Sequence, residues 1–270
     1  MWTHTALASE AAPANGEGWR VVEHQYTVST RKLVSTRDEQ EVLEAILEET
    51  KPAFPANTAH LHYLLKTPFR YPPSPFGSRF RRPQEGEGVF YCAEAVRTGL
   101  AEFSYWRRHF FEASPGTPLP DAHESLTVFS VAWRTPSHLD LTRPPLNKDR
   151  AQWTHPDDYT ATRALAAEAR RAGIQAIRYE SVRDPQRGAN LVLLAPAVFT
   201  QRNLLPSKPG ISTWAPAKAT ASGPAGMSPL PSRPHPPPDP SPIGFRSARG
   251  ARPGPGEFHS DVLAHPDNGN

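Results

Sequence analysis

The stretch GVFYCAEAVRTGLAE, residues 88–102, is the part of this sequence that is most informative about its fold. Residues 89–93 form a short apolar run, which predicts a buried strand. From residue 95 to residue 111 apolar side chains recur at helical intervals, which predicts a helix, although Gly99 is a weak helix former. The stretch therefore combines a strand and a helix in immediate succession.

The segment that precedes this unit, residues 67–88, is rich in arginine. It holds too many prolines and glycines for a regular element, so we predict a loop. Four arginines lie in it, namely Arg70, Arg79, Arg81 and Arg82. Long ordered loops inside a domain are usually functional, so we expect this one to contribute to a binding or catalytic site.

Further elements follow on both sides of the central stretch. Thr36 and Glu39 have capping-box spacing, which predicts a helix start. The helix that follows has one apolar face, made of Val42, Leu43, Ile46 and Leu47. Segments 19–23, 126–133, 176–182 and 191–194 are predicted strands, and 159–171 is a predicted helix that Gly173 caps.

The two ends of the chain differ in composition from its middle. Residues 1–18 are mostly small and polar, and residues 206–270 contain nearly half of the chain's 32 prolines. Neither segment has enough apolar side chains to offset the entropy lost on ordering, so we predict that both are disordered. The predicted fold is a single α/β (α+β) domain over 19–205, followed by a disordered Pro-rich tail.

Charge and cysteine content exclude several classes of protein. The formal net charge of +3 is small for 270 residues, and it does not predict the clustered basic face of a nucleic-acid-binding protein. Cys92 is the single cysteine, which excludes an internal disulfide and fits a reducing compartment. The sequence shows neither an apolar stretch of membrane-spanning length nor a secretory signal. We therefore expect a cytoplasmic protein without membrane contact.

Arg79, Tyr91 and Glu102 are residue types that together suit a dinucleotide. An arginine fork matches a pair of phosphate oxygens, and a tyrosine ring offers a flat surface to a cationic heterocycle. A carboxylate can hold a ribose hydroxyl and stabilise positive charge as a glycosidic bond breaks. NAD has all of these features, and no G-x-G-x-x-G motif indicates a Rossmann site instead.

Each candidate also has an ordinary structural explanation. Arg79 could be a surface arginine, Tyr91 a core residue and Glu102 a solvated helix residue. His60 and His62 lack a third ligand, so we predict no metal site. Cys92 points to the opposite sheet face from its neighbour in the strand, and we predict a buried, inert thiol.

Residues 77–102 resemble the RES domain, a family named for its arginine, glutamate and serine. Its core motif is similar to Gly-Gly-Arg-Trp, followed by a strand with a tyrosine and an alanine- and leucine-rich helical turn that ends in glutamate. Arg79, Tyr91 and Glu102 match those three positions. The family serine corresponds to Ser181 in the hexapeptide RYESVR, and its continuation GANLVL is a second match.

The resemblance covers about residues 60–200, and the sequence departs from the family pattern in places. Ser78 and Phe80 replace the second glycine and the tryptophan of the core motif. A further strand is expected near Trp214, where the chain instead reads TWAPAKATASGPAG.

RES domains resemble the ADP-ribosyltransferase fold of NAD-using toxins. Members of the family are bacterial toxins that degrade NAD by hydrolysis or by phosphorolysis, and a cognate antitoxin holds each of them inactive. The resemblance implies no resident cofactor: NAD is the expected substrate, with inorganic phosphate as an alternative to water. It also implies an antitoxin protein as partner, with no direct contact to nucleic acid.

The resemblance further implies a role for each site residue. Arg79 would bind the phosphates or a ribose, Tyr91 would stack on nicotinamide, and Glu102 would hold the nicotinamide ribose. Ser181 would line the same pocket, and Arg70 is expected to add a second cation. Nicotinamide would leave before water or phosphate attacks.

Three other functions remain open at this stage. An ADP-ribosyltransferase that modifies a protein would use the same residues. A catalytically inactive module would only bind its partner, although the presence of every motif residue argues against it. A nucleic-acid-binding protein is suggested by the basic pI and the sequence RFRR at 79–82, but an arginine-rich loop also suits a dinucleotide.

Overall fold

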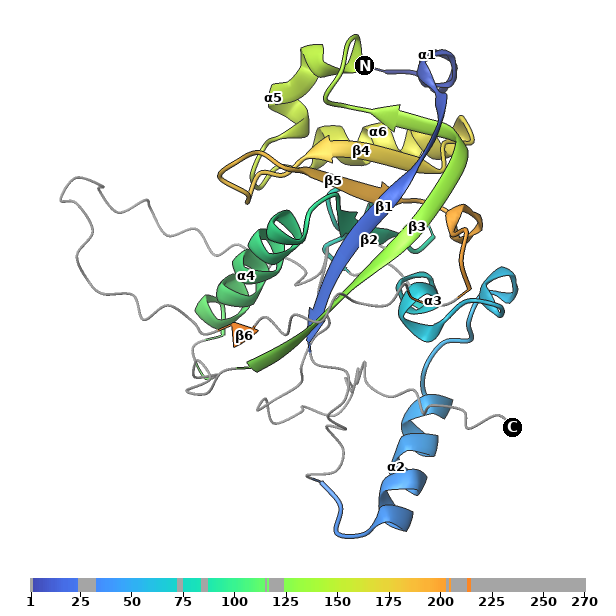
Figure 1. Cartoon of the computed structure of the whole chain (residues 1–270), viewed down its shortest axis with the longest axis vertical. Helices are drawn as coiled ribbons and strands as arrows, with labels where there is room; N and C mark the ends of the chain where they lie inside the picture. Colours follow the sequence, from blue (N-terminus) through green and yellow to red (C-terminus); the bar gives the residue numbers. More distant parts are fainter. Residues whose placement is uncertain are drawn as a thin grey trace, which may run out of the picture.

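The computed structural model of the chain describes residues 2–23, 33–71, 75–83, 87–114, 116, 124–202, 204 and 213–214. Its α-helices are α1 (His4–Glu10), α2 (Arg37–Glu49), α3 (Tyr63–Arg70), α4 (Val96–Glu112), α5 (Arg150–Trp153) and α6 (Thr160–Arg171). Its 3₁₀ turns are η2 (Ala56–Thr58), η3 (Leu146–Asp149) and η4 (Pro196–Val198). Its strands are β1 (Ala12–Glu23), β2 (Phe90–Ala93), β3 (Glu124–Asp140), β4 (Ala176–Glu180), β5 (Ala189–Leu193) and β6 (Thr213–Trp214). Figure 1 shows that they form a mixed fold of helices and sheet, which confirms the predicted fold class.

The strands form one sheet, in which the first strand also pairs with a strand near the opposite edge. Its order is β1-β2-β5-β4-β3-β6, and β1 also pairs with β3. This second pairing is antiparallel and runs from Ala12 opposite His138 to Glu23 opposite Leu126. The last three residues of β3 then pair in parallel with β4. Strands β1 to β5 therefore form a closed circuit, in which the long β1–β3 ribbon runs obliquely to β4 and β5 (Figure 1).

Two hydrophobic cores lie on the two faces of the sheet, because successive side chains of a strand point to opposite faces. In β2, Tyr91 belongs to the core that α1, α4 and α6 cover. Its neighbours Phe90 and Cys92 belong to the other core, against α3. Cys92 is fully buried, and burial raises the pKa of its thiol to about 12. The prediction of a buried thiol on the face opposite Tyr91 is confirmed.

Most predicted elements lie where the sequence places them. The capping box is formed: Thr36 Oγ1 accepts from the Glu39 amide at 3.2 Å, and the Glu39 carboxylate accepts from the Thr36 amide at 3.2 Å. Strands β2, β4 and β5 and helices α4 and α6 agree with prediction to within a few residues, and β3 is longer than predicted at both ends. Gly173 has φ +72°, the left-handed conformation expected of a C-cap glycine.

Disorder was predicted for residues 1–18, and this is wrong for residues 2–18, which the structure describes. Thr3 caps α1 by accepting a hydrogen bond from the Ala6 amide, and Leu7 of this helix is fully buried. The rest of the segment belongs to β1, whose backbone pairs with β3 along nearly its whole length. The small and polar residues of β1 bury little apolar area. They are ordered because their backbone groups form hydrogen bonds with the distant strand β3.

Two further boundaries differ from prediction. Residues 67–70 belong to α3 instead of the loop, and this helix tolerates Pro68 because Leu64, Leu65 and Phe69 bury their side chains in the core. The domain also extends beyond residue 205, since β6 pairs with the first two residues of β3. This short strand supplies the one expected near Trp214. The rest of the predicted disordered tail lies outside the described residues.

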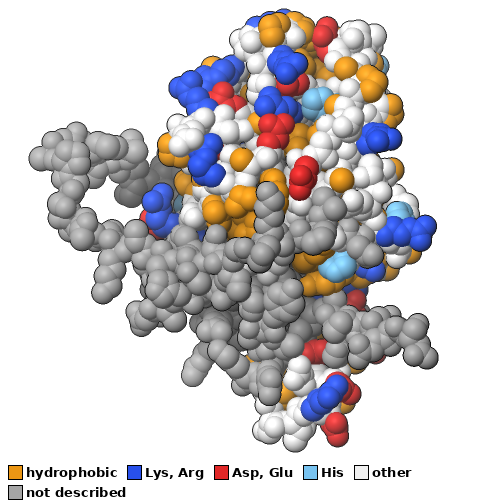
Figure 2. All heavy atoms as spheres, viewed as in Figure 1, with side chains coloured by type: hydrophobic (Ala, Val, Ile, Leu, Met, Phe, Trp, Pro, Cys, Tyr) orange, Lys and Arg blue, Asp and Glu red, His pale blue; other side chains and the backbone are white. Residues whose placement is uncertain are grey.

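The face of the molecule that Figure 2 presents carries charges of both signs. Lys and Arg side chains lie next to Asp and Glu side chains on this face. Arg178, for example, pairs with Glu94 at 2.7 Å and Asp140 at 3.4 Å. Such pairing does not favour a nucleic-acid-binding function, which needs basic groups that phosphates can reach. No helix in the described part of the chain has both the length and the apolar character to cross a membrane.

Candidate active site

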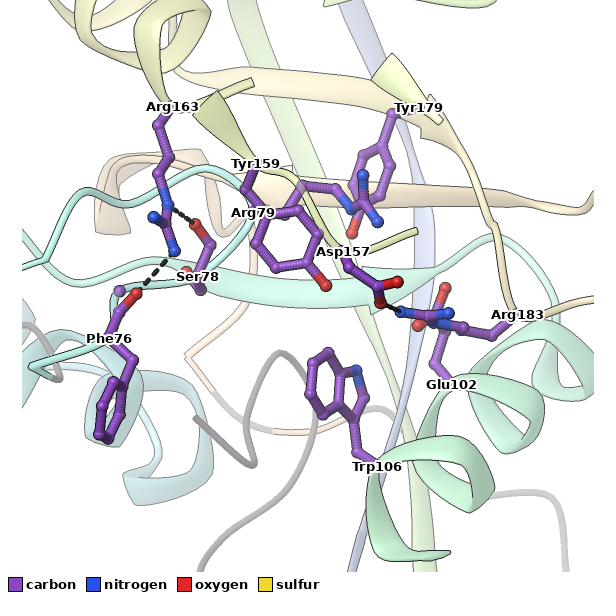
Figure 3. A pocket seen from close by; sticks show the side chains of 11 residues that line it. Phe76, Ser78, Arg79, Glu102, Trp106, Asp157, Tyr159, Arg163, Tyr179 and Arg183 are labelled. Carbon is purple, nitrogen blue, oxygen red and sulfur yellow. Dashed lines mark hydrogen bonds and ion pairs between the residues drawn. The ribbon is translucent and has the colours of Figure 1, made fainter. Parts of the chain in front are cut away.

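A pocket lies where the loop 76–79, the middle of α4, the segment before α6 and the end of β4 meet (Figure 3). Its volume is about 90 Å³. The residues that line it are Phe76, Gly77, Ser78, Arg79, Glu102, Trp106, Asp157, Tyr159, Arg163, Tyr179 and Arg183. The structure thus brings the predicted residues Arg79 and Glu102 to one pocket. Ser181 was expected to line this pocket but does not, and it contacts Glu102 instead.

Glu102 is the acidic residue of this pocket that the fold holds most firmly. It lies in the middle of α4 and is only 6% exposed. Its Oε1 atom accepts hydrogen bonds from Ser181 Oγ at 2.6 Å and from Asn190 Nδ2 at 2.7 Å. The other carboxylate oxygen, Oε2, accepts none from the described residues. The two donors fix the orientation of the carboxylate and leave Oε2 for a ligand in the pocket.

Asn190 is a site residue that the sequence analysis missed. It is the second residue of β5, is 1% exposed and pairs with Ala93 of β2. Since α4 begins three residues after Ala93, the pairing of Asn190 with Ala93 places the Asn190 side chain within hydrogen-bond distance of Glu102. Its Oδ1 atom has no partner among the described residues. The sequence did contain a sign of this role. Asn190 is the polar residue of the otherwise apolar run ANLVL, and a buried side-chain amide in a strand needs a hydrogen-bond partner.

A tight turn after β4 holds Ser181 in place. Its hydroxyl donates to Glu102 and accepts hydrogen bonds from the backbone amides of Arg183 at 3.2 Å and Asp184 at 3.1 Å. Its own amide donates to the Gly188 carbonyl at 2.8 Å, which closes the turn. The hydroxyl therefore has one fixed orientation, with its proton directed to Glu102.

Asp184 also joins this turn to α4, one helical turn before Glu102. Its carboxylate accepts from Thr98 Oγ1 at 2.8 Å and pairs with Arg97. Burial alone would raise the pKa of Asp184, but hydrogen bonds from the Gln186 amide and Thr98, together with the Arg97 charge, lower it overall. Gly188 allows this close approach, since a Cβ there would lie 2.1 Å from Thr98 Oγ1. Thr98 is one helical turn before Glu102, so two successive turns of α4 are joined to the Ser181 turn.

Arg79 joins the loop to the segment before α6. Its Nη1 donates to the backbone carbonyls of Trp153 and His155, at 3.0 Å each. The guanidinium also lies 4.4 Å from the centroid of the Tyr159 ring. These contacts use two of its five N–H groups, so the remaining donors can still serve a ligand. Gly77, with φ +64°, provides the turn that leads into Arg79.

Tyr91 supports the loop from the sheet and does not line the pocket. Its ring is buried in the core, and its hydroxyl lies 2.8 Å from Ser78 Oγ and accepts from the Phe80 amide at 3.1 Å. Burial raises the pKa of the Tyr91 phenol, so the hydroxyl stays neutral. The position does not support the predicted stacking on nicotinamide, because a stacking ring must face the ligand. The aromatic side chains that do line the pocket are Phe76, Trp106, Tyr159 and Tyr179.

The structure places Arg70 outside the pocket. Its Nη1 donates to Glu48 of α2 at 2.6 Å, its Nε donates to the Pro52 carbonyl, and its guanidinium lies 4.2 Å from the Phe54 ring centroid. The expectation that Arg70 supplies a second cation to the site is therefore wrong, because its guanidinium binds Glu48 of α2. Arg163 and Arg183 are the additional arginines of the pocket.

Tyr179 is a further pocket residue that was not predicted. It is buried, with its ring 4.7 Å from that of Phe80. Burial, and then the negative charge of Glu102, raise the pKa of Tyr179 well above its ordinary value. Its phenol is consequently neutral at all ordinary pH values and can donate a hydrogen bond but cannot act as a base.

No group of three or more His, Cys, Asp or Glu side chains within the described ranges is arranged to hold a metal ion. The groups that line the pocket are the carboxylates of Glu102 and Asp157, the guanidinium groups of three arginines, and several aromatic rings.

Comparison with known proteins identifies the family. The model of the RES domain matches residues 54–214. This is more than half of the chain, and the chain belongs to the RES-domain family, as its motifs predicted. Among solved structures, one chain of the crystal structure of the M. tuberculosis MbcT–MbcA toxin–antitoxin complex is similar, with 12% sequence identity and a TM-score of 0.41. The match covers 72% of this chain and 89% of that one. No curated protein matches the sequence.

Proposed function

We propose that this protein is an NAD-degrading enzyme, a glycohydrolase or a phosphorylase that cleaves the bond between nicotinamide and ribose. The observation that carries the proposal is the state of Glu102. A carboxylate is held in a buried position by two donors on one oxygen, and its other oxygen remains for a ligand. Arginine donors line the same pocket. This combination suits a phosphorylated ribosyl substrate whose reacting carbon becomes positively charged.

The proposed reaction is dissociative. The electron pair of the glycosidic bond leaves with nicotinamide, which turns the cationic base into a neutral leaving group. The ribose carbon acquires oxocarbenium character, and the carboxylate of Glu102 stabilises that charge while Oε2 accepts a ribose hydroxyl. Water then adds with loss of a proton and gives ADP-ribose, or phosphate adds and gives the 1-phosphate of ADP-ribose.

Ser181 and Asn190 act on this chemistry through Glu102. Both donate to Oε1, and neither lines the pocket. We assign them as positioning residues that keep the carboxylate in one orientation before the substrate arrives. Preorganised groups stabilise a transition state without a cost of reorganisation during the reaction.

The size of the pocket limits how much of the substrate it encloses. About 90 Å³ is less than the roughly 300–1,000 Å³ of clefts that bury a drug-sized ligand. The pocket therefore suits the nicotinamide–ribose end, with Tyr159 or Trp106 as the ring that contacts nicotinamide. The adenosine end of NAD would extend beyond it.

Family membership also supports a role for the protein as the toxin of a bacterial toxin–antitoxin pair. In that role it would act on NAD in the cytoplasm and would be held inactive by a cognate antitoxin. The gene adjacent to its own is then expected to encode a small protein that abolishes NAD consumption when the two proteins are mixed.

The test is incubation of the purified, antitoxin-free protein with NAD, with and without phosphate, beside a Glu102→Ala variant. Release of nicotinamide with free ADP-ribose, absent in the variant, supports a glycohydrolase. Dependence on phosphate supports a phosphorylase. ADP-ribose attached to protein would support the ADP-ribosyltransferase alternative. No turnover by the folded protein contradicts the proposal and favours a partner-binding module.

A further inference from the structure

Three arginines line the pocket, and their guanidinium groups are engaged differently. Arg79 donates to two backbone carbonyls at 3.0 Å, as described above. Arg163 also donates to two backbone carbonyls, those of Ser78 at 3.0 Å and Phe76 at 2.6 Å. Both arginines therefore tie segments of the chain together. Arg183 is the pocket arginine that has a carboxylate as an ion partner.

Arg183 is rigidly placed next to the reactive centre. It lies two residues after Ser181, and its backbone amide donates to the Ser181 hydroxyl at 3.2 Å. Its guanidinium carbon lies 3.5 Å from the centroid of the Tyr105 ring, and its Nη2 donates to the Pro156 carbonyl at 2.7 Å. The stacking fixes the plane of the guanidinium, while most of its five N–H groups are not used by these contacts.

The carboxylate partner of Arg183 is weakly held. Asp157 Oδ1 lies 3.7 Å from Nη2, which is beyond hydrogen-bond distance, and its side chain is 77% exposed. Figure 3 shows the two groups facing each other at the pocket, with Glu102 beside Arg183. The Arg183 side chain is only 9% exposed, so the weakness of this pair comes from the long distance and from the solvation of Asp157. An anion with better geometry can therefore replace Asp157.

We propose that Arg183 binds the diphosphate of the substrate and that Asp157 occupies its fork when no substrate is bound. This inference rests on the proposed function and names the part of NAD that Arg183 contacts. A planar guanidinium donates two parallel hydrogen bonds to a phosphate, which a carboxylate at 3.7 Å does not receive. Asp157 is thereby an internal competitor whose removal favours the ligand.

The experiment measures the affinity for ADP-ribose by calorimetry, together with kcat and KM for NAD. The variants are Arg183→Gln, Arg183→Lys and Asp157→Asn, with Arg187→Gln as the matched control. Arg187 lies in the same turn, is largely exposed and does not line the pocket. Thermal unfolding establishes that each variant is folded.

Arg183→Gln is expected to weaken ADP-ribose binding by about 10- to 100-fold and to raise KM similarly, with kcat within about threefold. Arg183→Lys keeps the charge but loses the fork, and its affinity is expected to lie between those of wild type and Arg183→Gln. Asp157→Asn is expected to bind ADP-ribose about two- to fivefold more tightly. Arg187→Gln is expected to match the wild type.

A loss of kcat at unchanged ADP-ribose affinity in Arg183→Gln would overturn the inference, because Arg183 would then act only on the Ser181 turn. If Arg183→Gln does not fold, the Asp157→Asn variant provides the test. An ADP-ribose affinity of this variant equal to that of the wild type would reject the inference. A wild type that consumes NAD but does not bind ADP-ribose rejects it too. Arg183-dependent ADP-ribose binding without NAD turnover leaves the inference intact and rejects the proposed function.

Discussion

Replacement of Asn190 by aspartate is expected to make the stability of the protein strongly dependent on pH. The substitution keeps the size of the side chain but puts a second carboxyl group 2.7 Å from Glu102 Oε1. Both positions are buried, at 1% and 6% exposure. Two negative charges at this distance repel each other by about 6 kcal/mol, taking an effective dielectric constant of about 20. The pKa of the introduced carboxyl is therefore raised far above its ordinary value in the folded protein.

The direction of the pH dependence follows from this raised pKa. Below about pH 4 the introduced carboxyl is protonated in the folded and in the unfolded chain, and it donates to Glu102 much as the amide does. Above that pH the unfolded chain loses the proton while the folded protein retains it. The variant then loses about 1.4 kcal/mol of unfolding free energy per pH unit, or about 4 kcal/mol between pH 4 and pH 7. For a domain of this size that corresponds to a fall of about 8–16 °C in Tm.

The assay is thermal unfolding of the wild type and Asn190→Asp from pH 4.5 to pH 7.5. Asn57→Asp serves as control, because Asn57 is exposed and the substitution introduces the same charge. The difference in Tm between Asn190→Asp and the wild type should widen as the pH rises, and that of the control should not. An equal difference at both ends of the pH range would refute the contact between Asn190 and the Glu102 carboxylate.

Three other substitutions or probes test separate parts of the structure. Tyr91→Phe leaves the buried Phe80 amide without its acceptor, so the unfolding free energy in urea should fall by about 1–3 kcal/mol; an unchanged value would contradict a supporting role for the hydroxyl. Arg70→Gln removes the ion pair with Glu48 and the contacts with Pro52 and Phe54, all outside the pocket. KM for NAD should therefore stay within about twofold, while the unfolding free energy should fall by about 1–3 kcal/mol. A large rise in KM would show that Arg70 takes part in substrate binding. Cys92 is buried, and its pKa of about 12 keeps it a thiol, so iodoacetamide at pH 8 should modify it in urea but not in the native protein, as mass spectrometry would show.

The sequence predicted the parts of the fold that depend on neighbouring residues. The β2–α4 unit, the capping box of α2 and the C-cap at Gly173 are local patterns, and each is confirmed. The meeting of Arg79 and Glu102 at one pocket was also expected from the family motif. The N-terminal segment was missed because its order comes from pairing with β3, more than a hundred residues away in the chain.

The parts of the site that were missed depend on register and on side-chain direction. Asn190 reaches Glu102 only because β5 pairs with β2 in one register, which the residue pattern does not specify. Tyr91 was expected to face a ligand, but alternation along β2 directs it into the core beneath the loop. Arg70 was counted among the loop arginines, whereas α3 turns it toward α2. Composition cannot distinguish these arrangements, since the same residue types suit a core, a surface ion pair or a pocket.

The most direct measurement of the central claim is the rate of nicotinamide release from NAD by the wild type and by Glu102→Gln. The variant keeps the shape of the side chain and an oxygen that can accept from Ser181 and Asn190, but it removes the negative charge. Loss of about 3 kcal/mol of transition-state stabilisation predicts a rate lower by about 150-fold at an unchanged Tm. A folded Glu102→Gln protein that releases nicotinamide within tenfold of the wild-type rate would contradict the role assigned to this carboxylate.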